Sequence, residues 1–263
     1  MKPFIPRIGL FSRFLTLMLF GSIFVGSATA QDTTSARKWR FLAEPYIMFP
    51  YMDGETGIGN NLVLPVEADP GDIFSKLKMA GMLYFEAKTD KWAISTDLVY
   101  MNLQQDVKPG ILIYSATVGA KQFIWGASGL YRLLPFLELG AGGRINYLQT
   151  SSEGRINVLP AGTQEFSGRH SKTWFDPVII ARLSTDINDK WLFQFVGDVG
   201  GFGVGSDLTW QLQGYVGYSF TKLFQLTAGY RVLSVDYYAG EAPKDFIFDV
   251  NEFGPVIRFG FNF

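Results

Sequence analysis

One histidine is the residue best suited by type to do chemistry in this chain. His170 is the only histidine, and it lies next to Ser171 and shortly before Asp176. A histidine oriented by a carboxylate can take the proton of a serine hydroxyl and so create a nucleophile. Ser171 is a poor partner, however, because neighbouring side chains on a strand point to opposite faces. His170 is therefore a weak catalytic candidate, and an exposed loop histidine is the alternative interpretation.

The residue types offer little to a metal or a cofactor. With no cysteine and one histidine, a thiolate or multi-histidine metal site cannot be built. The acidic residues Glu67, Asp69 and Asp72 could hold a divalent cation that bridges lipopolysaccharide, or they belong to a solvated turn. A G-x-G-x-G pattern over residues 201–205 lies between strand-like segments, whereas a nucleotide loop opens a helix. We predict a tight exposed hairpin there, and neither a metal nor a cofactor.

Alternation of apolar with polar residues recurs from residue 38 to the C-terminus and predicts strands. At the end of the chain, Ile257, Phe259, Phe261 and Phe263 share one face, and Arg258 lies on the other. We predict about ten such strands, each long enough to cross a membrane. They lie near residues 38–51, 76–88, 91–104, 111–124, 131–149, 173–186, 190–201, 206–220, 222–237 and 251–263.

The connections between these segments alternate in length. Tight turns are predicted at residues 89–90, 126–128, 186–189 and 221–222, and long loops near 52–75, 150–172 and 238–250. Short turns on one side and longer loops on the other are typical of a transmembrane barrel. We therefore predict one all-β domain over residues 31–263, an antiparallel up-and-down transmembrane β-barrel of about ten strands, with eight or twelve as alternatives.

Charged residues are predicted on the strand face opposite the apolar one. Six are basic and six are acidic, so the predicted lumen is close to neutral. Charges in a narrow interior are costly unless they are paired, which favours a lumen filled by ion pairs over a solute path. The residues are Arg40, Glu44, Lys78, Glu86, Asp97, Glu138, Arg144, Asp176, Arg182, Asp198, Arg231 and Arg258.

Aromatic residues make up 16% of the chain and gather near the predicted strand ends. Such positions fit the aromatic girdles of a membrane barrel, and the alternative is the core of a soluble β-sandwich or lipocalin-like barrel. The charged second faces argue against that alternative. The girdle candidates are Trp39, Tyr100, Tyr131, Tyr147, Trp174, Trp191, Trp210, Tyr218, Tyr230 and Tyr237.

The first thirty residues predict export. A basic start with Lys2, Arg7 and Arg13 precedes a short apolar run, and small residues end at Ala30. This is the pattern of a cleavable signal peptide over residues 1–30, since the apolar run is short for a membrane anchor. Cleavage removes three bases and no acid, so the formal net charge falls from −1 to −4. Such a mildly acidic chain gives no reason to expect nucleic acid as a partner.

The chain resembles bacterial outer-membrane barrel proteins. Its last alternate residues, Ile257, Phe259, Phe261 and Phe263, resemble the C-terminal assembly signal of that class. The resemblance implies the outer membrane as location, and its lipids, lipopolysaccharide and assembly machinery as partners. Residues 174–178 and 200–207 also resemble recurrent stretches of small, poorly characterised outer-membrane proteins, which carry no known chemistry.

The resemblance leaves the activity open. Lipid A deacylases of this class use a histidine and a serine, whereas omptin-type proteases have ten strands and use an Asp–His pair beside two aspartates. The paired aspartates are not evident here, and His170 is the only residue that could serve either pattern. We therefore expect a non-enzymatic barrel with a structural or loop-mediated surface-binding role and no known ligand. A narrow channel and an outer-membrane hydrolase are the alternatives.

Overall fold

The computed structural model describes residues 39–58, 63–107, 109–110, 113–158, 162–186, 190–240 and 246–263. The predicted signal peptide, residues 1–30, lies outside the described residues. No helix within the described ranges is long and apolar enough to cross a bilayer.

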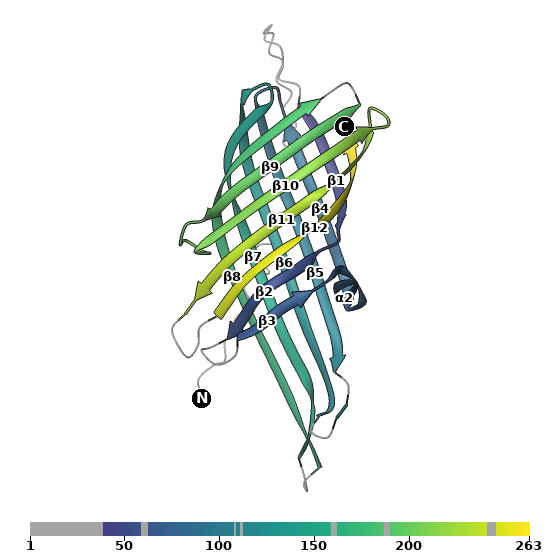
Figure 1. The fold of residues 1–263 in the computed structure, drawn as a ribbon, viewed down its shortest axis with the longest axis vertical. Coiled ribbons are helices and arrows are strands. Elements are labelled where there is room, and N and C mark those ends of the chain that lie inside the picture. Colours follow the sequence, from purple (N-terminus) through teal and green to yellow (C-terminus); the bar gives the residue numbers. More distant parts are fainter. Residues whose placement is uncertain are drawn as a thin grey trace, which may run out of the picture. The chain divides into compact units, whose positions relative to one another are not determined.

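Ten antiparallel strands close into a barrel, which confirms the predicted fold class and the preferred strand number. Each strand of the ring pairs with the next one around it, and β12 pairs with β1, so this ring leaves no open edge. Figure 1 shows the short turns and the C-terminus at one end and the long central strands reaching toward the other. The ring consists of β1 (Arg40–Met48), β4 (Leu77–Lys88), β5 (Trp92–Val107), β6 (Ile113–Leu134), β7 (Leu137–Val158), β8 (Gly162–Asp186), β9 (Trp191–Gly201), β10 (Leu208–Ser219), β11 (Phe224–Ala239) and β12 (Phe246–Asn262).

Three elements were not expected from the sequence. The predicted first strand is broken after Met48, at Phe49 and Pro50, and the chain continues as β2 (Tyr51–Ile58). β1 pairs with the C-terminal half of β12, whereas β2 pairs with its N-terminal half. β3 (Val63–Ala68) pairs with β2, and the short helix α2 (Pro70–Ser75) leads into β4. The predicted loop over residues 52–75 is therefore wrong.

The other two long loops are also largely strand. β7 and β8 stay in register as far as the pair Val158 and Gly162, and β11 and β12 as far as Ala239 and Phe246. Beyond the membrane both faces of a strand can meet water, so the apolar alternation that marks a strand is lost there. Strand sequence of this kind is hard to distinguish from loop sequence.

The predicted turn at residues 126–128 is wrong as well. β6 runs straight through these small residues, and the turn lies at Pro135 and Phe136 instead. Gly126 stands between Asp97 of β5 and Arg144 of β7 in the strand register. A Cβ atom added at Gly126 would meet nothing within 4 Å, so no neighbouring side chain requires a glycine at this position.

The exterior is apolar and the ends carry aromatic pairs. Trp92 packs edge-on against Tyr131 at 4.8 Å beside the short turns, and Tyr51 stacks on Phe253 at 5.6 Å farther up the wall. The large hydrophobic residues of the strands, such as Ile179 at 59%, are exposed on the outside. This is the surface that a lipid bilayer requires of a barrel.

Two of the predicted girdle residues lie inside instead. Trp174 and Tyr237 are buried, and their rings stack at 4.2 Å. Their strands place them on the inward face, in phase with Asp176 and with Leu233 and Val235. Proximity to a strand end therefore did not distinguish an interfacial aromatic residue from an interior one.

The turn between β9 and β10 depends on glycine at a specific position. A Cβ atom at Gly205 would lie 2.2 Å from the carbonyl oxygen of Phe175 and 2.6 Å from Oδ1 of Asp176. Gly205→Ala should therefore lower the free energy of unfolding by about 2 kcal/mol. Thermal unfolding of the refolded protein in detergent measures the effect. Gly81→Ala is the control, because nothing lies within 4 Å of its added Cβ; an equal loss in both variants would contradict the prediction.

Candidate functional site: a lumen closed in layers

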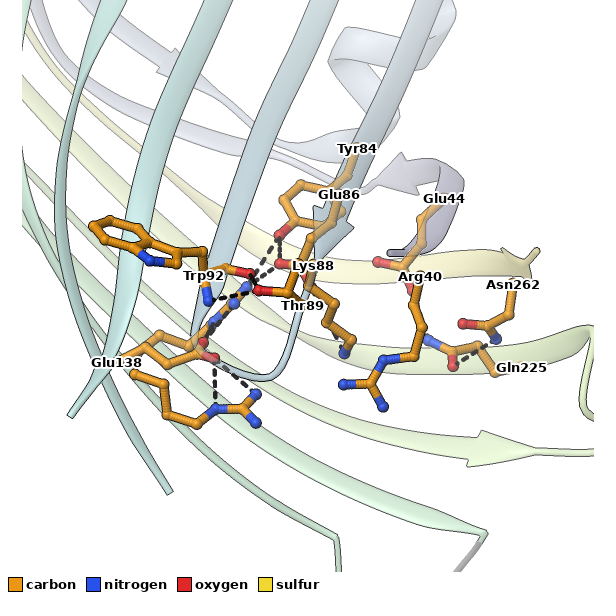
Figure 2. Close-up of polar contacts among 12 residues, drawn as sticks. Arg40, Glu44, Tyr84, Glu86, Lys88, Thr89, Trp92, Glu138, Gln225 and Asn262 are labelled. Atoms are coloured by element: carbon orange, nitrogen blue, oxygen red, sulfur yellow. Dashed lines mark hydrogen bonds and ion pairs between the residues drawn. The ribbon is translucent and has the colours of Figure 1, made fainter. Parts of the chain in front are cut away.

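The inward faces of the strands form a polar layer nearest the short turns. Arg182 of β8 binds Glu138 of the neighbouring β7 and Glu86 of β4, which is four strands away in the ring. Tyr84 donates to Glu86 at 2.8 Å and accepts from Arg182 at 3.2 Å. Figure 2 shows the contact between Tyr84 and Glu86. One guanidinium thus ties opposite walls together.

A second arginine is held among aromatic rings. The guanidinium carbon of Arg258 lies 4.1 Å from the ring centre of Tyr215, 4.9 Å from Tyr84 and 5.2 Å from Tyr46. It also binds Glu44 at 3.3 Å and the hydroxyl of Tyr215 at 2.7 Å. Cation–π attraction is strong when the cation is desolvated, as it is here. The centre of the polar layer is therefore filled by stacked side chains.

Two more arginines complete the layer. Arg231 binds Asp97 at 3.1 Å, and Tyr46 donates to the other oxygen of the same carboxylate at 2.7 Å. Arg144 binds Asp198 at 2.8 Å and Thr209 at 3.1 Å. Each of these arginines is at most 5% exposed. All four buried cations of the layer therefore have a carboxylate partner.

The structure places two of the twelve predicted lumen charges elsewhere. Arg40 pairs at 3.5 Å with Asp90 at the short-turn rim, and side chains of both residues are more than half exposed. Figure 2 shows Arg40 beside this rim. Lys78 is exposed at an irregularity of the β4–β5 register. Both lie near strand ends, where an inward phase no longer implies a place inside the lumen.

Asp176 is fully buried, yet its partners are neutral. It accepts from the backbone N–H of Ser206 at 2.6 Å, from Asn146 at 2.7 Å and from Trp174 at 3.1 Å. Several donors can stabilise a buried carboxylate without a cation. The arrangement fastens the β9–β10 turn to the inner wall, which accounts for the buried Ser206 in the glycine-rich segment.

Sequence reasoning missed the neutral members of the network. Tyr46, Tyr84, Gln213 and Tyr215 bind the charged groups, and only the charges had been considered. A signal was available, because Tyr46 lies two residues from Glu44 and Tyr84 two residues from Glu86, on the same strand face. Polar aromatic residues in phase with lumen charges are therefore candidates for the same network.

An apolar layer lies above the polar one. Its buried residues include Val99, Ile124, Trp174, Val235 and Phe248, which come from five different strands. A part-buried polar contact, in which Gln122 donates a hydrogen bond to Glu252, lies among these apolar residues. The layer crosses the lumen and separates the arginine network from the long-strand end.

The free volume along the lumen follows these layers. A vestibule of about 480 Å³ opens at the short-turn end beside Glu138 and Asn262. The void within the polar layer is about 90 Å³, and that in the apolar layer is about 10 Å³. A void of about 10–15 Å³ is the least that holds one water molecule, so the void found in the apolar layer has room for about one. At the long-strand end a cavity of about 700 Å³ opens again.

His170 lines this last cavity, which we call the cup. Its ring stacks on Phe246 at 5.9 Å, and its Nε2 atom is buried and has no hydrogen-bond partner. Its cross-strand neighbour is Thr150. No group of three or more potential metal ligands occurs within the described ranges, and Glu67, Asp69 and Asp72 form no such group. Asp69 instead caps α2 by accepting from the backbone of Asp72 at 2.8 Å.

Comparison with known proteins finds only weak structural likenesses. No family model matches the chain, and no curated protein matches its sequence. The outer membrane protease OmpT from Escherichia coli has 11% identity and a TM-score of 0.49, covering 85% of this chain and 97% of that one. The CymD monoaromatic hydrocarbon channel has 11% identity and a TM-score of 0.36, covering 85% and 87%. Ail, the attachment invasion locus protein of Yersinia pestis, has 9% identity and a TM-score of 0.35, covering 84% and 98%.

These neighbours include a protease, a channel and an attachment protein, and likenesses this weak carry no argument about activity. The closed ring of ten antiparallel strands, with an apolar exterior and a polar lumen, is the architecture of a small outer-membrane β-barrel.

Removing the central cation of the polar layer should destabilise the barrel. Arg182→Met leaves Glu86 and Glu138 buried without the guanidinium they share, which should cost about 3–5 kcal/mol of unfolding free energy. Glu138 keeps Arg132 at 2.9 Å, whereas the cation left near Glu86 is the more distant, partly exposed Lys88 at 3.7 Å, so adding Glu86→Gln should recover most of the loss. Urea unfolding of the refolded protein in lipid vesicles measures both variants.

Arg40→Met is the matched control for this series. Arg40 also forms an ion pair, but the pair is exposed and screened by water, so its loss should change stability little. Equal destabilisation by Arg40→Met and Arg182→Met would show that the buried ion pairs contribute no more to stability than an exposed one.

Proposed function

We propose that this protein is a non-enzymatic, non-conducting barrel of the bacterial outer membrane that binds a ligand at its outer end. The observation that carries the proposal is the closure of the lumen, where the void falls to about 10 Å³ in the apolar layer. Below it, the four arginines are paired rather than arranged along a wet path. The cup is then the part of the interior that a solute from outside can reach.

The location is inferred from the exterior. A closed strand ring satisfies its backbone in lipid, and exposed apolar residues such as Ile179, Phe195 and Ile257 face outward. In barrels of this class the short turns are periplasmic, which assigns the long-strand end to the cell surface. Lipopolysaccharide and membrane lipids are the expected surroundings of that wall.

The C-terminal residues support assembly by the outer-membrane machinery. Ile257, Phe259, Phe261 and Phe263 lie on the outer face with exposed fractions from 37% to 66%. Phe263 also stacks on Phe41 of β1 at 5.8 Å, so the same segment that would be recognised ends at the seam that closes the barrel.

The two alternatives are less well supported. A narrow channel would require the apolar layer to open, since dry constrictions block ions by excluding water. A hydrolase would require His170 to contact a serine or a carboxylate, whereas its Nε2 atom has no hydrogen-bond partner. Both observations favour the closed, non-enzymatic barrel over these alternatives.

Single-channel recording in a planar bilayer tests the closure. The refolded mature protein should show no conductance steps, because the apolar and polar layers both block the lumen. Heat-dependent mobility on a gel confirms that the protein is folded, and a porin in the same bilayer is the positive control. Discrete steps whose ion selectivity changes in Arg182→Glu would establish a pore and overturn the proposal.

A further inference from the structure

The cup differs in chemistry from the rest of the lumen. Its inner surface carries apolar side chains that remain open to solvent, among them Leu64 at 53% and Val118 at 41% exposure. The other side chains on its inward faces include Leu103, Phe246, Thr150 and Ser152. No acidic residue is among the described residues that line the cavity. Such a concave apolar surface with a few polar groups is typical of a site for a small molecule.

One polar atom in the cup lacks a partner. Nε2 of His170 is buried without a hydrogen bond, although buried polar atoms are nearly always paired. The imidazole lies flat against Phe246, which belongs to the buried apolar cluster that forms the floor. Because Nε2 is closed off from the empty cavity, the imidazole must turn toward a ligand oxygen to form the missing bond, as donor or acceptor according to its tautomer.

The wall of the cup is interrupted on one side. β3 pairs with β2 alone, and β5 beyond Gln104 pairs only with β6, so among the described residues no strand joins β3 to β5. Leu64 on β3 and Leu103 on β5 belong to the two sides of this gap, and both line the cavity. Figure 1 shows α2 outside the wall beside β5, at the level where β4 begins.

The gap starts close to the edge of the lipid-facing band. On β5 the outward residues change from Tyr100 to Asn102, and on β12 from Phe253 to Asn251. β4 ends its pairing with β5 at Leu77 and Leu103, one residue above Asn102. Phe74 of α2, packed on Phe49 at 5.5 Å, adds apolar surface there. A molecule with an apolar chain can therefore approach the cup along the outer surface of the membrane.

We propose that the cup binds one single-chain amphiphile, with its chain against Leu64, Leu103 and Val118 and an oxygen headgroup, hydroxyl or carboxylate, bonded to His170. This inference rests on the proposed binding role and names the ligand class. The volume of about 700 Å³ suits one small molecule and is too small for a lipid with several acyl chains. The absence of lining acids leaves a cationic headgroup without a partner.

The single histidine provides a direct readout. Full-length mature protein labelled with ¹⁵N-histidine, free of a histidine tag and held in phospholipid nanodiscs, gives one imidazole spectrum. Decanol and decanoate should each shift the Nε2 resonance in a saturable way, whereas decyltrimethylammonium should not. A resonance that stays unmoved at saturating decanol and decanoate, or that moves equally with the ammonium compound, overturns the proposal.

Equilibrium binding of radiolabelled decanoate to the same nanodiscs adds a test with variants. Val118→Trp should fill the cup and reduce the specific binding at least ten-fold, and Val118→Thr, of matched size, should leave it intact. His170→Phe preserves the stacking on Phe246 and removes the hydrogen bond, so it should weaken binding about ten-fold. Undiminished binding to Val118→Trp would place the ligand outside the cup and overturn the proposal.

The two proposals fail in different measurements. Conductance steps in the bilayer would overturn the proposal of a closed barrel, whatever binds in the cup. If the barrel shows no conductance and neither decanol nor decanoate shifts the His170 resonance, only the ligand assignment is overturned.

Discussion

The structure depends on a constraint set by the backbone: in lipid, a ring of strands must close, and closure turns half of all side chains into a narrow lumen. Every inward polar group must then find its partner across a short distance. Arg182 reaches Glu86 four strands away, and Arg258 fits among three tyrosine rings. The pairing that makes burial of these charges tolerable is also what fills the space through which a solute would pass.

The sequence was sufficient for the part of the fold that lipid imposes. The alternation of apolar and polar residues up to Phe263 predicted the strands, their apolar faces and a count of ten strands. It did so because one face of each strand must meet hydrocarbon on every crossing of the membrane. The sequence prediction failed in segments whose faces do not have to meet hydrocarbon. Residues 150–158 and 162–172 are strand, and Gly126 lies within strand β6 rather than in a turn. The turn at Pro135 and Phe136 lies among apolar residues, and the polar and glycine residues that mark the other turns are missing there.

The candidate site was only partly predictable for a related reason. Phase along a strand identifies which residues point inward, so Glu44, Asp97 and Arg231 could be assigned to the lumen from the sequence. Phase does not say how far along the barrel a residue lies. Arg40 shares the inward phase and ends at the rim, and the division into polar layer, apolar layer and cup appears only when ten strands are aligned by their register.

That alignment gives the two ends of the lumen different chemical characters. The vestibule beside Glu138 is lined by charges that satisfy one another, whereas the cup exposes Leu64 and Val118 to solvent and leaves His170 with an unpaired nitrogen. Apolar surface in a water-filled mouth and an unsatisfied buried atom both disfavour an empty state. Because the apolar floor is sealed, a molecule that relieves both can be held in the cup but cannot pass through. Closure of the lumen and binding at its mouth are therefore two consequences of the same packing.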